Sequence, residues 1–279
     1  MPAKGVSNKA CKPVDWVRRG ESVQGVEHIE AFFQGKAYGM HRHDTYAIGR
    51  TLGGVQSFNY RSSLRNSLPG DVIVLHPDER HDGQAGHRDG FHYRMVYVEP
   101  SLIQAALGGR SLPFIEGGST NDLRLRNATA ALLQSVSSSH EALEHHEGIE
   151  GLALALAAAS NAPEAQRTKD YVSAQRVREF LDANLCRAVR LEEVETAVGR
   201  DRWSLSRDFR AYFGTSPYRY LTMRRLGAAR QMMLRGTALA ESAVAVGFAD
   251  QSHMTRHFLQ AYGLSPARWL RTLRALRSC

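Results

Sequence analysis

Three histidines are spaced so that their side chains could share one task. His41 and His43 lie two residues apart in a segment of strand character, so both imidazoles face one side, and His81 could supply a third. Three imidazoles suit iron, zinc or copper, but neutral imidazoles also hydrogen-bond small ligands or neighbouring strands. Hydrogen bonding is the favoured role of these histidines. We therefore expect these histidines to line a ligand pocket and to hold no metal or other cofactor.

Other polar side chains are candidates for the same pocket. Tyr46, Arg94 and Tyr97 occur on segments that read as strands, and from there they could orient a small ligand inside an apolar barrel. A purely structural role stays open for all three.

A motif near the carboxy-terminal end of the chain occurs twice. Residues 207–217 and 256–266 both read R-x-F-x4-G-x-S-P, at a constant offset of 49 residues. A short apolar helix ending in glycine precedes each copy, at Leu191 to Gly199 and at Leu239 to Gly247. Glycine ends such a helix and turns the chain, and Ser-Pro starts a new helix. The repeat predicts two helix-turn-helix units.

The second helix of each unit is predicted to face DNA. The major groove admits one helix, and a guanidinium group pairs with guanine O6 and N7, whereas Ser and Thr suit phosphate or base. The predicted contacts are Arg202, Trp203, Ser206, Arg207 and Arg210 in the first unit, and Gln251, Ser252, His253, Thr255 and Arg256 in the second. A core position stays open for Trp203, and a phosphate contact or a solvated charge for Arg210. Asp201 and Asp250 are interpreted as helix caps, because phosphate repels a carboxylate.

The excess positive charge lies in the same region. The chain has a net charge of +8, and residues 170–279 contain 18 Arg, no Lys and 10 acidic residues, which accounts for all of that excess. A basic region favours a polyanionic partner, because each cation that neutralises a phosphate releases a counterion. The alternative is a solvated face that keeps the protein soluble. Together with the repeat, the charge indicates double-stranded DNA as a partner.

The remaining pattern predicts an α+β protein with several domains. From Val26 to Tyr97 the residues alternate between turn signals, which is typical of short antiparallel strands. Helices are expected over 122–136 and 141–159, and residues 161–168 read as a polar linker. We expect a β-barrel domain with an N-terminal arm at 1–100, a helical segment and linker at 101–165, and an all-α DNA-binding domain at 166–279.

We expect the protein to act in the cytoplasm and to have no membrane partner. The longest apolar run, Leu152 to Ala159, is far shorter than the ~20 residues that a membrane-spanning helix needs.

Residues 174–271 resemble the DNA-binding domain of the AraC/XylS family of bacterial transcription regulators. VGFADQSHMTRHF at 246–258 and YGLSP at 262–266 carry the resemblance. It implies two helix-turn-helix units joined by a long helix, here Pro217 to Leu234, with both reading helices in successive turns of the major groove. Glu195 and Arg200 depart from the family pattern in the first unit, and we expect them to disturb its packing or to lean outward.

The N-terminal region resembles the cupin-like effector domain of the same family. HRHDTYAIG at 41–49, PGD at 69–71 and HPDERH at 76–81 carry this resemblance. It implies a small β-barrel that holds a small molecule, followed by helices that form a dimer interface. Metal-binding cupins usually supply a carboxylate four or five residues after the second histidine, where this chain has Ala47 and Ile48.

These features favour a transcription regulator in which a small effector binds the barrel, the helices at 122–159 pair two protomers, and RNA polymerase is a further partner. The alternative is a metal-dependent cupin enzyme, a dioxygenase or an isomerase, that carries a DNA-binding domain. No G-x-S-x-G, P-loop or G-x-G-x-x-G motif accompanies the histidines. We therefore predict no catalytic residue and no enzymatic activity.

Overall fold

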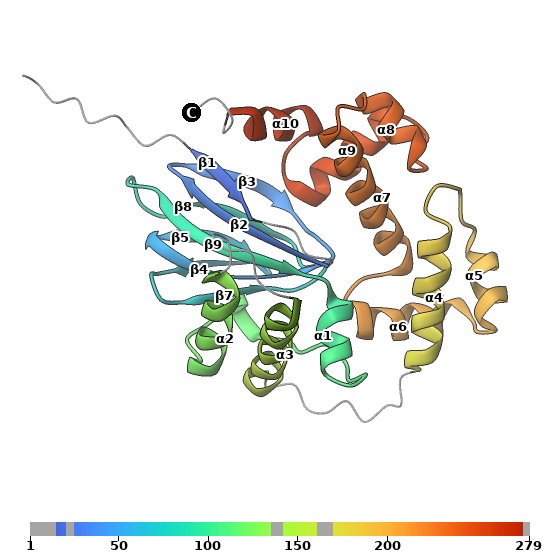
Figure 1. Ribbon diagram of the computed structural model, residues 1–279, viewed down its shortest axis with the longest axis horizontal. Helices are drawn as coiled ribbons and strands as arrows, with labels where there is room; N and C mark the ends of the chain where they lie inside the picture. The colour runs from blue at the N-terminus through green and yellow to red at the C-terminus, as the bar shows by residue number, and fades with distance from the viewer. Residues whose placement is uncertain (1–14, 21–24, 135–141, 161–169, 276–279) are drawn as a thin grey trace, which may run out of the picture.

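The computed structural model describes residues 15–20, 25–134, 142–160 and 170–275. Strands and three helices form one region, and helices alone form the other (Figure 1). The strands are β1 (Trp16–Arg19), β2 (Val26–Phe33), β3 (Lys36–His41), β4 (Tyr46–Gly54), β5 (Gln56–Tyr60), β6 (Ser63–Ser67), β7 (Val72–Leu75), β8 (His81–Ala85), β9 (Phe91–Val98) and β10 (Ser119–Thr120). The helices are α1 (Pro100–Ala106), α2 (Leu123–Leu133), α3 (Ala142–Ala159), α4 (Tyr171–Ala183), α5 (Leu191–Val198), α6 (Arg202–Phe213), α7 (Pro217–Leu234), α8 (Leu239–Ala245), α9 (Gln251–Tyr262) and α10 (Pro266–Ala275), with a 3-10 helix η1 (Glu116–Gly118) before β10. The predicted α+β class is confirmed.

The barrel consists of two facing antiparallel sheets. The larger has the order β1-β2-β9-β4-β7-β10, and the smaller has the order β3-β8-β5-β6. Side chains such as Phe58, Tyr60 and Tyr93 fill the space between the sheets. Helices α1, α2 and α3 cover the outer face of the larger sheet (Figure 1) and pack on it through side chains such as Leu125 and Leu152.

Strand β9 is buried on both of its faces. Phe91, Tyr93 and Met95 point between the sheets, whereas Val96 and Val98 point toward the covering helices. Successive side chains of a strand alternate in this way, so residue parity decides which layer a side chain enters.

The helical region contains the two predicted helix-turn-helix units, α5–α6 and α8–α9. Gly199 follows α5 in the left-handed conformation, at a φ of 71°, and this lets the chain turn sharply into α6. Helix α7 joins the units and spans the predicted 217–234. Its first half packs on the first unit through Tyr220 and Leu221, and its second half packs on the second unit through Leu226 and Met233. One continuous helix therefore holds both units.

The strands extend beyond the predicted region at both ends. β1 precedes it and pairs with β2, and β10 lies in the segment predicted to be helical and pairs with β7. Both strands are too short for an alternating pattern to reveal them. Helices α2 and α3 confirm the predicted helices at 122–136 and 141–159, although residues 135, 136 and 141 lie outside the described residues, as does the predicted linker at 161–168. None of the described helices is long and apolar enough to cross a membrane.

Candidate functional site

Helix α6 presents one polar face to solvent. Leu205, Phe209 and Phe213 anchor its other side in the core. Successive residues of an α-helix are rotated by about 100°, so the five predicted contacts fall on one side. Four of them are exposed and the fifth, Ser206, is half-buried; the four are Arg202, Trp203, Arg207 and Arg210. Trp203 is 75% exposed, so the alternative that it packs in the core is wrong.

Helix α9 repeats this face. Gln251, Ser252 and Arg256 are exposed and Thr255 is half-buried. These four residues stand 49 positions after Arg202, Trp203, Arg207 and Ser206, respectively, so they form the equivalent side of the helix.

His253 differs from the other predicted contacts of α9. It is rotated by about 200° from Gln251 around the helix axis. Its ring packs edge-on against Phe248 at a centroid distance of 5.4 Å, and its Nε2 lies 3.0 Å from Nε2 of His257. The prediction that His253 faces DNA is therefore corrected: its half-buried ring packs on the turn that precedes α9.

Aspartates cap both reading helices, as predicted. Asp201 accepts hydrogen bonds from the backbone N–H groups of Trp203 and Ser204, and Asp250 accepts one from the N–H of His253. A carboxylate at this position satisfies free N–H groups and interacts favourably with the helix dipole. Both reading helices therefore begin at a defined residue.

The two charges that depart from the family pattern take part in ion pairs. Glu195 accepts hydrogen bonds from the backbone N–H and the guanidinium of Arg202. Arg200 lies 2.6 Å from Asp170 and 3.5 Å from Asp208. These contacts join α4, α5 and α6, so the residues that were expected to disturb the first unit connect its helices.

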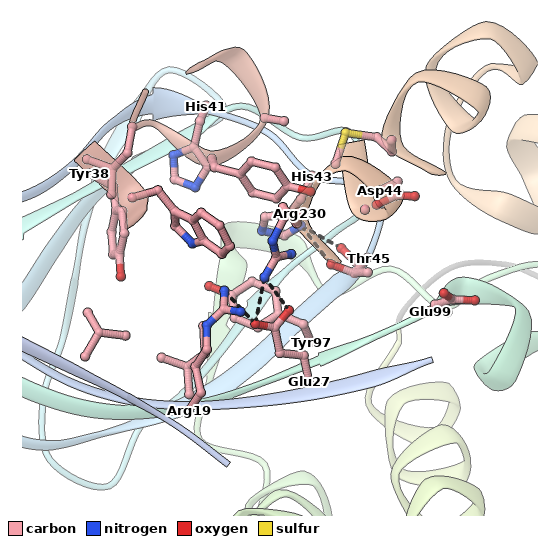
Figure 2. A pocket seen from close by; sticks show the side chains of 18 of the residues that line it. Arg19, Glu27, Tyr38, His41, His43, Asp44, Thr45, Tyr97, Glu99 and Arg230 are labelled. Atoms are coloured by element: carbon pink, nitrogen blue, oxygen red, sulfur yellow. Dashed lines mark hydrogen bonds and ion pairs between the residues drawn. The ribbon is translucent and has the colours of Figure 1, made fainter. Parts of the chain in front are cut away.

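A cavity of about 430 Å³ lies between the barrel and the helical region. Strands β1, β2 and β3 line one side, and α7, α9 and α10 line the other (Figure 2). Much of the lining is apolar, with contributions from Ile29, Phe33, Met223, Ala228 and Trp269. The cavity is therefore suited to the apolar body of a small molecule.

Two guanidinium groups share one carboxylate in this cavity. Arg230 contacts Glu27 at 3.1 Å and Arg19 contacts it at 2.9 Å, and Figure 2 shows both directed at the same side chain. Burial opposes ionisation of Glu27, but Arg230 and Arg19 outweigh it and hold its pKa below the ordinary value. Burial, and then the charge of Arg230, lower the pKa of Arg19. The Nε of Arg230 is buried and has no hydrogen-bond partner in the described part of the chain.

The cations of Arg19 and Arg230 also lie over aromatic rings. The guanidinium of Arg230 is 4.9 Å from the ring centre of Tyr262 and 5.2 Å from that of Trp269, and Arg19 is 5.2 Å from Trp269. Such rings stabilise the cations, and the hydroxyl of Tyr262 also interacts with Arg230. Two cations thus face the single carboxylate of Glu27 in this part of the cavity.

Further ion pairs join the barrel to α7. Arg224 contacts Glu99 and lies 2.8 Å from Asp44, and Arg219 lies 2.6 Å from Asp78. Burial would lower the pKa of Arg224, but Asp44 and Glu99 raise it well above the ordinary value. Helix α7 therefore holds both helix-turn-helix units and also carries the cations that dock them on the barrel.

The carboxy-terminal end of each reading helix also contacts the N-terminal half of the chain. The N–H of Leu112 donates to the carbonyl of Ala211 at 3.2 Å, and the N–H of Arg42 donates to the carbonyl of Gln260 at 3.1 Å. Docking therefore sets the orientation of both α6 and α9.

The three predicted histidines come together beside the cavity. Ring centres are 4.3 Å apart for His41 and His81, 4.7 Å for His43 and His81, and 6.1 Å for His41 and His43. Burial is the first cause of a lowered pKa in each: that of His43 falls to about 3, that of His81 falls well below its ordinary value, and that of His41 is lowered. All three imidazoles are neutral near pH 7.

Two known domain families together match most of the chain. Residues 23–158 match the AraC-like ligand binding domain, and residues 194–272 match a helix-turn-helix domain. The chain belongs to the AraC family of transcription regulators. It is a DNA-binding regulator of transcription under the control of a small-molecule effector.

Relatives of this AraC-family regulator include an uncharacterised HTH-type transcriptional regulator of Bacillus subtilis, YbfI. The two are 26% identical over 242 residues, which cover 81% of this chain and 86% of YbfI. The fold is similar to that of ToxT from Vibrio cholerae, with a TM-score of 0.65 at 12% identity over 89% of this chain and 98% of ToxT. A ToxT structure with bound unsaturated fatty acid has a TM-score of 0.60 at 14% identity, over 93% of this chain and 95% of that one.

The structure divides the predicted pocket residues of the regulator into two groups. His41, His43 and Tyr97 line the cavity, and His81 packs against both histidines. Tyr46 does not reach it, because its side chain enters the layer under the helices and its hydroxyl donates to the carbonyl of Pro113 at 2.7 Å.

Arg94 is also placed wrongly by the prediction. It pairs with Glu30 at 3.2 Å and is three residues from Tyr97 on β9, so the two side chains point to opposite faces of the sheet. Strand alternation could have revealed this from the sequence.

Sequence reasoning missed Arg19, Glu27 and Arg230. No local motif marks them, since Arg19 and Glu27 lie on neighbouring strands and Arg230 is one of 18 arginines in the basic region. Only the docking of α7 on the barrel brings the three together.

Proposed function

We propose that this regulator reads double-stranded DNA with α6 and α9 in successive turns of the major groove, and that an anionic effector in the interdomain cavity controls docking. The repeated exposed face carries the first part of the proposal. The proposed DNA contacts are Arg202, Trp203, Ser206, Arg207, Arg210, Gln251, Ser252, Thr255 and Arg256. The proposed domain limits are those expected from the sequence, 1–100, 101–165 and 166–279.

The charges of the cavity support an effector with a carboxylate and an apolar body. Arg19 and Arg230 share the single carboxylate of Glu27, so a second carboxylate in the cavity would balance their charge. ToxT structures with bound unsaturated fatty acid or (E)-4-(8-methylnaphthalen-1-yl)but-3-enoic acid support the same class of ligand. A molecule that contacts both walls of the cavity binds the docked and the undocked protein with different affinities. That difference in binding free energy is the amount by which the molecule changes the free energy of docking.

Matched arginine variants test DNA reading. A site is first selected from genomic fragments with the full-length regulator. We expect Arg207→Ala and Arg256→Ala each to weaken specific binding by about 1 to 3 kcal/mol and to relax base preference at one position. Arg235→Ala removes an equal charge from the exposed C-cap of α7 and serves as the control. A loss of the same size for all sequences, or in Arg235→Ala, contradicts base reading by these helices.

Acid and ester pairs test the effector class. Medium- and long-chain carboxylic acids, but not their methyl esters, are expected to raise the melting temperature of the regulator, because only the ionised head pairs with Arg230. Arg230→Gln should weaken acid binding at least about 10-fold, as expected for loss of a charged hydrogen bond. Arg210→Gln on α6 should leave it unchanged. Equal binding of acid and ester would contradict the assignment.

The regulator is further proposed to act in the cytoplasm as a homodimer that contacts RNA polymerase. The exposed Leu123 of α2 and Leu154 of α3, 64% and 50% accessible, support the predicted pairing through these helices. Leu154→Glu should shift sedimentation from dimer to monomer; an unchanged dimer would place the interface elsewhere. No catalytic role is proposed.

A further inference from the structure

His41, His43 and His81 form a compact cluster at the edge of the smaller sheet. His41 on β3 is the register partner of His81 on β8, and His43 follows β3 by two residues. His43 and His81 are 5% and 3% exposed, and His41 is 9% exposed. The ligand nitrogens of the three residues lie within 4.8 Å of one another.

The backbone fixes the orientation of each ring. The Nδ1 of each histidine lies 2.8–2.9 Å from a carbonyl oxygen two residues away. The acceptors are Gly39, Thr45 and Glu79. Because a carbonyl only accepts, Nδ1 carries the proton and Nε2 keeps a free lone pair. The Nε2 of His43 is buried and has no hydrogen-bond partner among the described residues.

These lone pairs select a cation as the ligand. An Nδ1–H donated to a carbonyl is the arrangement that orients histidines around a metal. A tetrahedral zinc ion with bonds of about 2.0–2.1 Å needs nitrogens ~3.3 Å apart, so small ring rotations would close the cluster around one. Neither Asp44 nor Asp82, the carboxylates that directly follow His43 and His81 in the chain, is free to join it, because Asp44 pairs with Arg224 and Asp82 accepts from Asn59.

Contrary to the expectation from the sequence that these histidines hold no metal, we propose that the Nε2 atoms of His41, His43 and His81 bind one divalent transition-metal ion, best matched by zinc. The ion would lie beside the interdomain cavity, because His41 and His43 line it. Figure 2 shows His41 on the opposite side of that cavity from Arg19 and Glu27. The metal site is therefore distinct from the arginine pair.

The site also lies at a docking contact of the DNA-binding domain. Arg42, between two of the ligands, donates its backbone N–H to Gln260 of α9 at 3.1 Å. Gly39, which orients His41, faces Gly263 at the end of α9. A bound ion would hold this strand end in the conformation that receives α9, so metal loading should stabilise the docked state.

Cobalt and zinc titrations of the full-length regulator test the site. Chelator-treated protein is titrated with Co²⁺, whose visible d–d absorption reports tetrahedral nitrogen coordination, and with Zn²⁺ against a chromophoric chelator. The wild type should bind about one equivalent of either ion. His43→Ala and His81→Gln should lose the cobalt bands and weaken zinc binding at least about 100-fold. His87→Ala, which changes an exposed histidine on a turn, should bind like the wild type.

Folding and function are measured on the same samples. His81→Gln keeps a polar side chain of similar size, so it tests the site even if His43→Ala fails to fold, and circular dichroism verifies the metal-free proteins. Absence of metal from the wild type, or equal binding by His81→Gln, overturns the proposal. DNA binding and binding of carboxylic acids are assayed without metal and test the proposed function separately. Failure of the metal site and failure of the proposed function are therefore distinguishable.

Discussion

At the scale of single residues, His76 is a buried base whose protonation opposes folding. Its Nε2 accepts a hydrogen bond from the N–H of Ile115 at 2.9 Å, so Nδ1 carries the proton and donates to the hydroxyl of Tyr60 at 2.7 Å. Burial, followed by the charge of Arg61, lowers the pKa of His76 to about 3. A second proton would break the bond from Ile115.

The sign of the pH dependence follows from that shift. The unfolded chain binds the proton at about pH 6.5, whereas the folded chain does not until about pH 3. The contribution of His76 to stability is therefore complete above about pH 6.5 and declines as the pH falls.

His76→Gln should reduce the acid sensitivity of the regulator. Urea unfolding between pH 6 and pH 4 should show a slope shallower by about 1.4 kcal/mol per pH unit than that of the wild type, because glutamine does not titrate. At pH 7.5 the variant should be less stable by about 1 to 3 kcal/mol, since one buried hydrogen bond is altered. Parallel pH profiles would show that His76 titrates normally in the folded state.

At the scale of elements, two glycines that end helices form a matched pair. Gly199 and Gly214 both have a φ of 71°, but a Cβ on Gly199 would meet nothing, whereas one on Gly214 would lie 2.5 Å from Cβ of Pro77 in the barrel domain. The first substitution tests backbone conformation alone. The second also tests the contact between α6 and the barrel.

Gly199→Ala should destabilise the regulator by about 1 kcal/mol, the cost of the left-handed conformation for a residue with a Cβ. Gly214→Ala should cost more and should also loosen docking, as measured by hydrogen exchange of the Leu112 amide, which donates to α6. Equal losses of stability and equal exchange rates in the two variants would contradict a tight contact at Gly214.

At the scale of the whole molecule, α7 both joins the reading units and docks them. Its arginines Arg219, Arg224 and Arg230 all pair with carboxylates of the barrel domain. The two regions have separate hydrophobic cores. Loss of the ion pairs should therefore separate the regions without unfolding either one.

Arg224→Gln tests this separation. It leaves Asp44 and Glu99 without their cation, a change that costs about 3 to 5 kcal/mol for a buried pair. We expect a larger radius of gyration in X-ray scattering, two calorimetric transitions and retained DNA binding. Arg235→Gln should behave like the wild type. Scattering unchanged by Arg224→Gln would contradict the role of this pair.

A fragment of residues 168–279 should bind DNA by itself, because both reading helices, α7 and the whole excess of positive charge lie within it. Gel shift at low salt measures this. A folded fragment that shifts no DNA would count against DNA reading by α6 and α9.

The sequence determined the features that depend on neighbouring residues. The repeat around Arg207 and Arg256, the aspartate caps and the helix 217–234 follow from helix periodicity and end signals, which act over a few positions. Helix periodicity would also have placed His253 off the reading face, and strand alternation would have placed Arg94 opposite Tyr97. The grouping of His41, His43 and His81 was predicted, since two of them are two residues apart on one chain segment.

Only the tertiary structure decided how these parts work together. The meeting of Arg19, Glu27 and Arg230 depends on how α7 docks on the barrel, and no local pattern encodes it. Tyr46 shows the same limit within the barrel, because a strand buried on both faces has no polar side to mark which layer a side chain enters. Long-range burial and ion pairing create the cavity, because they join surfaces that lie far apart along the chain.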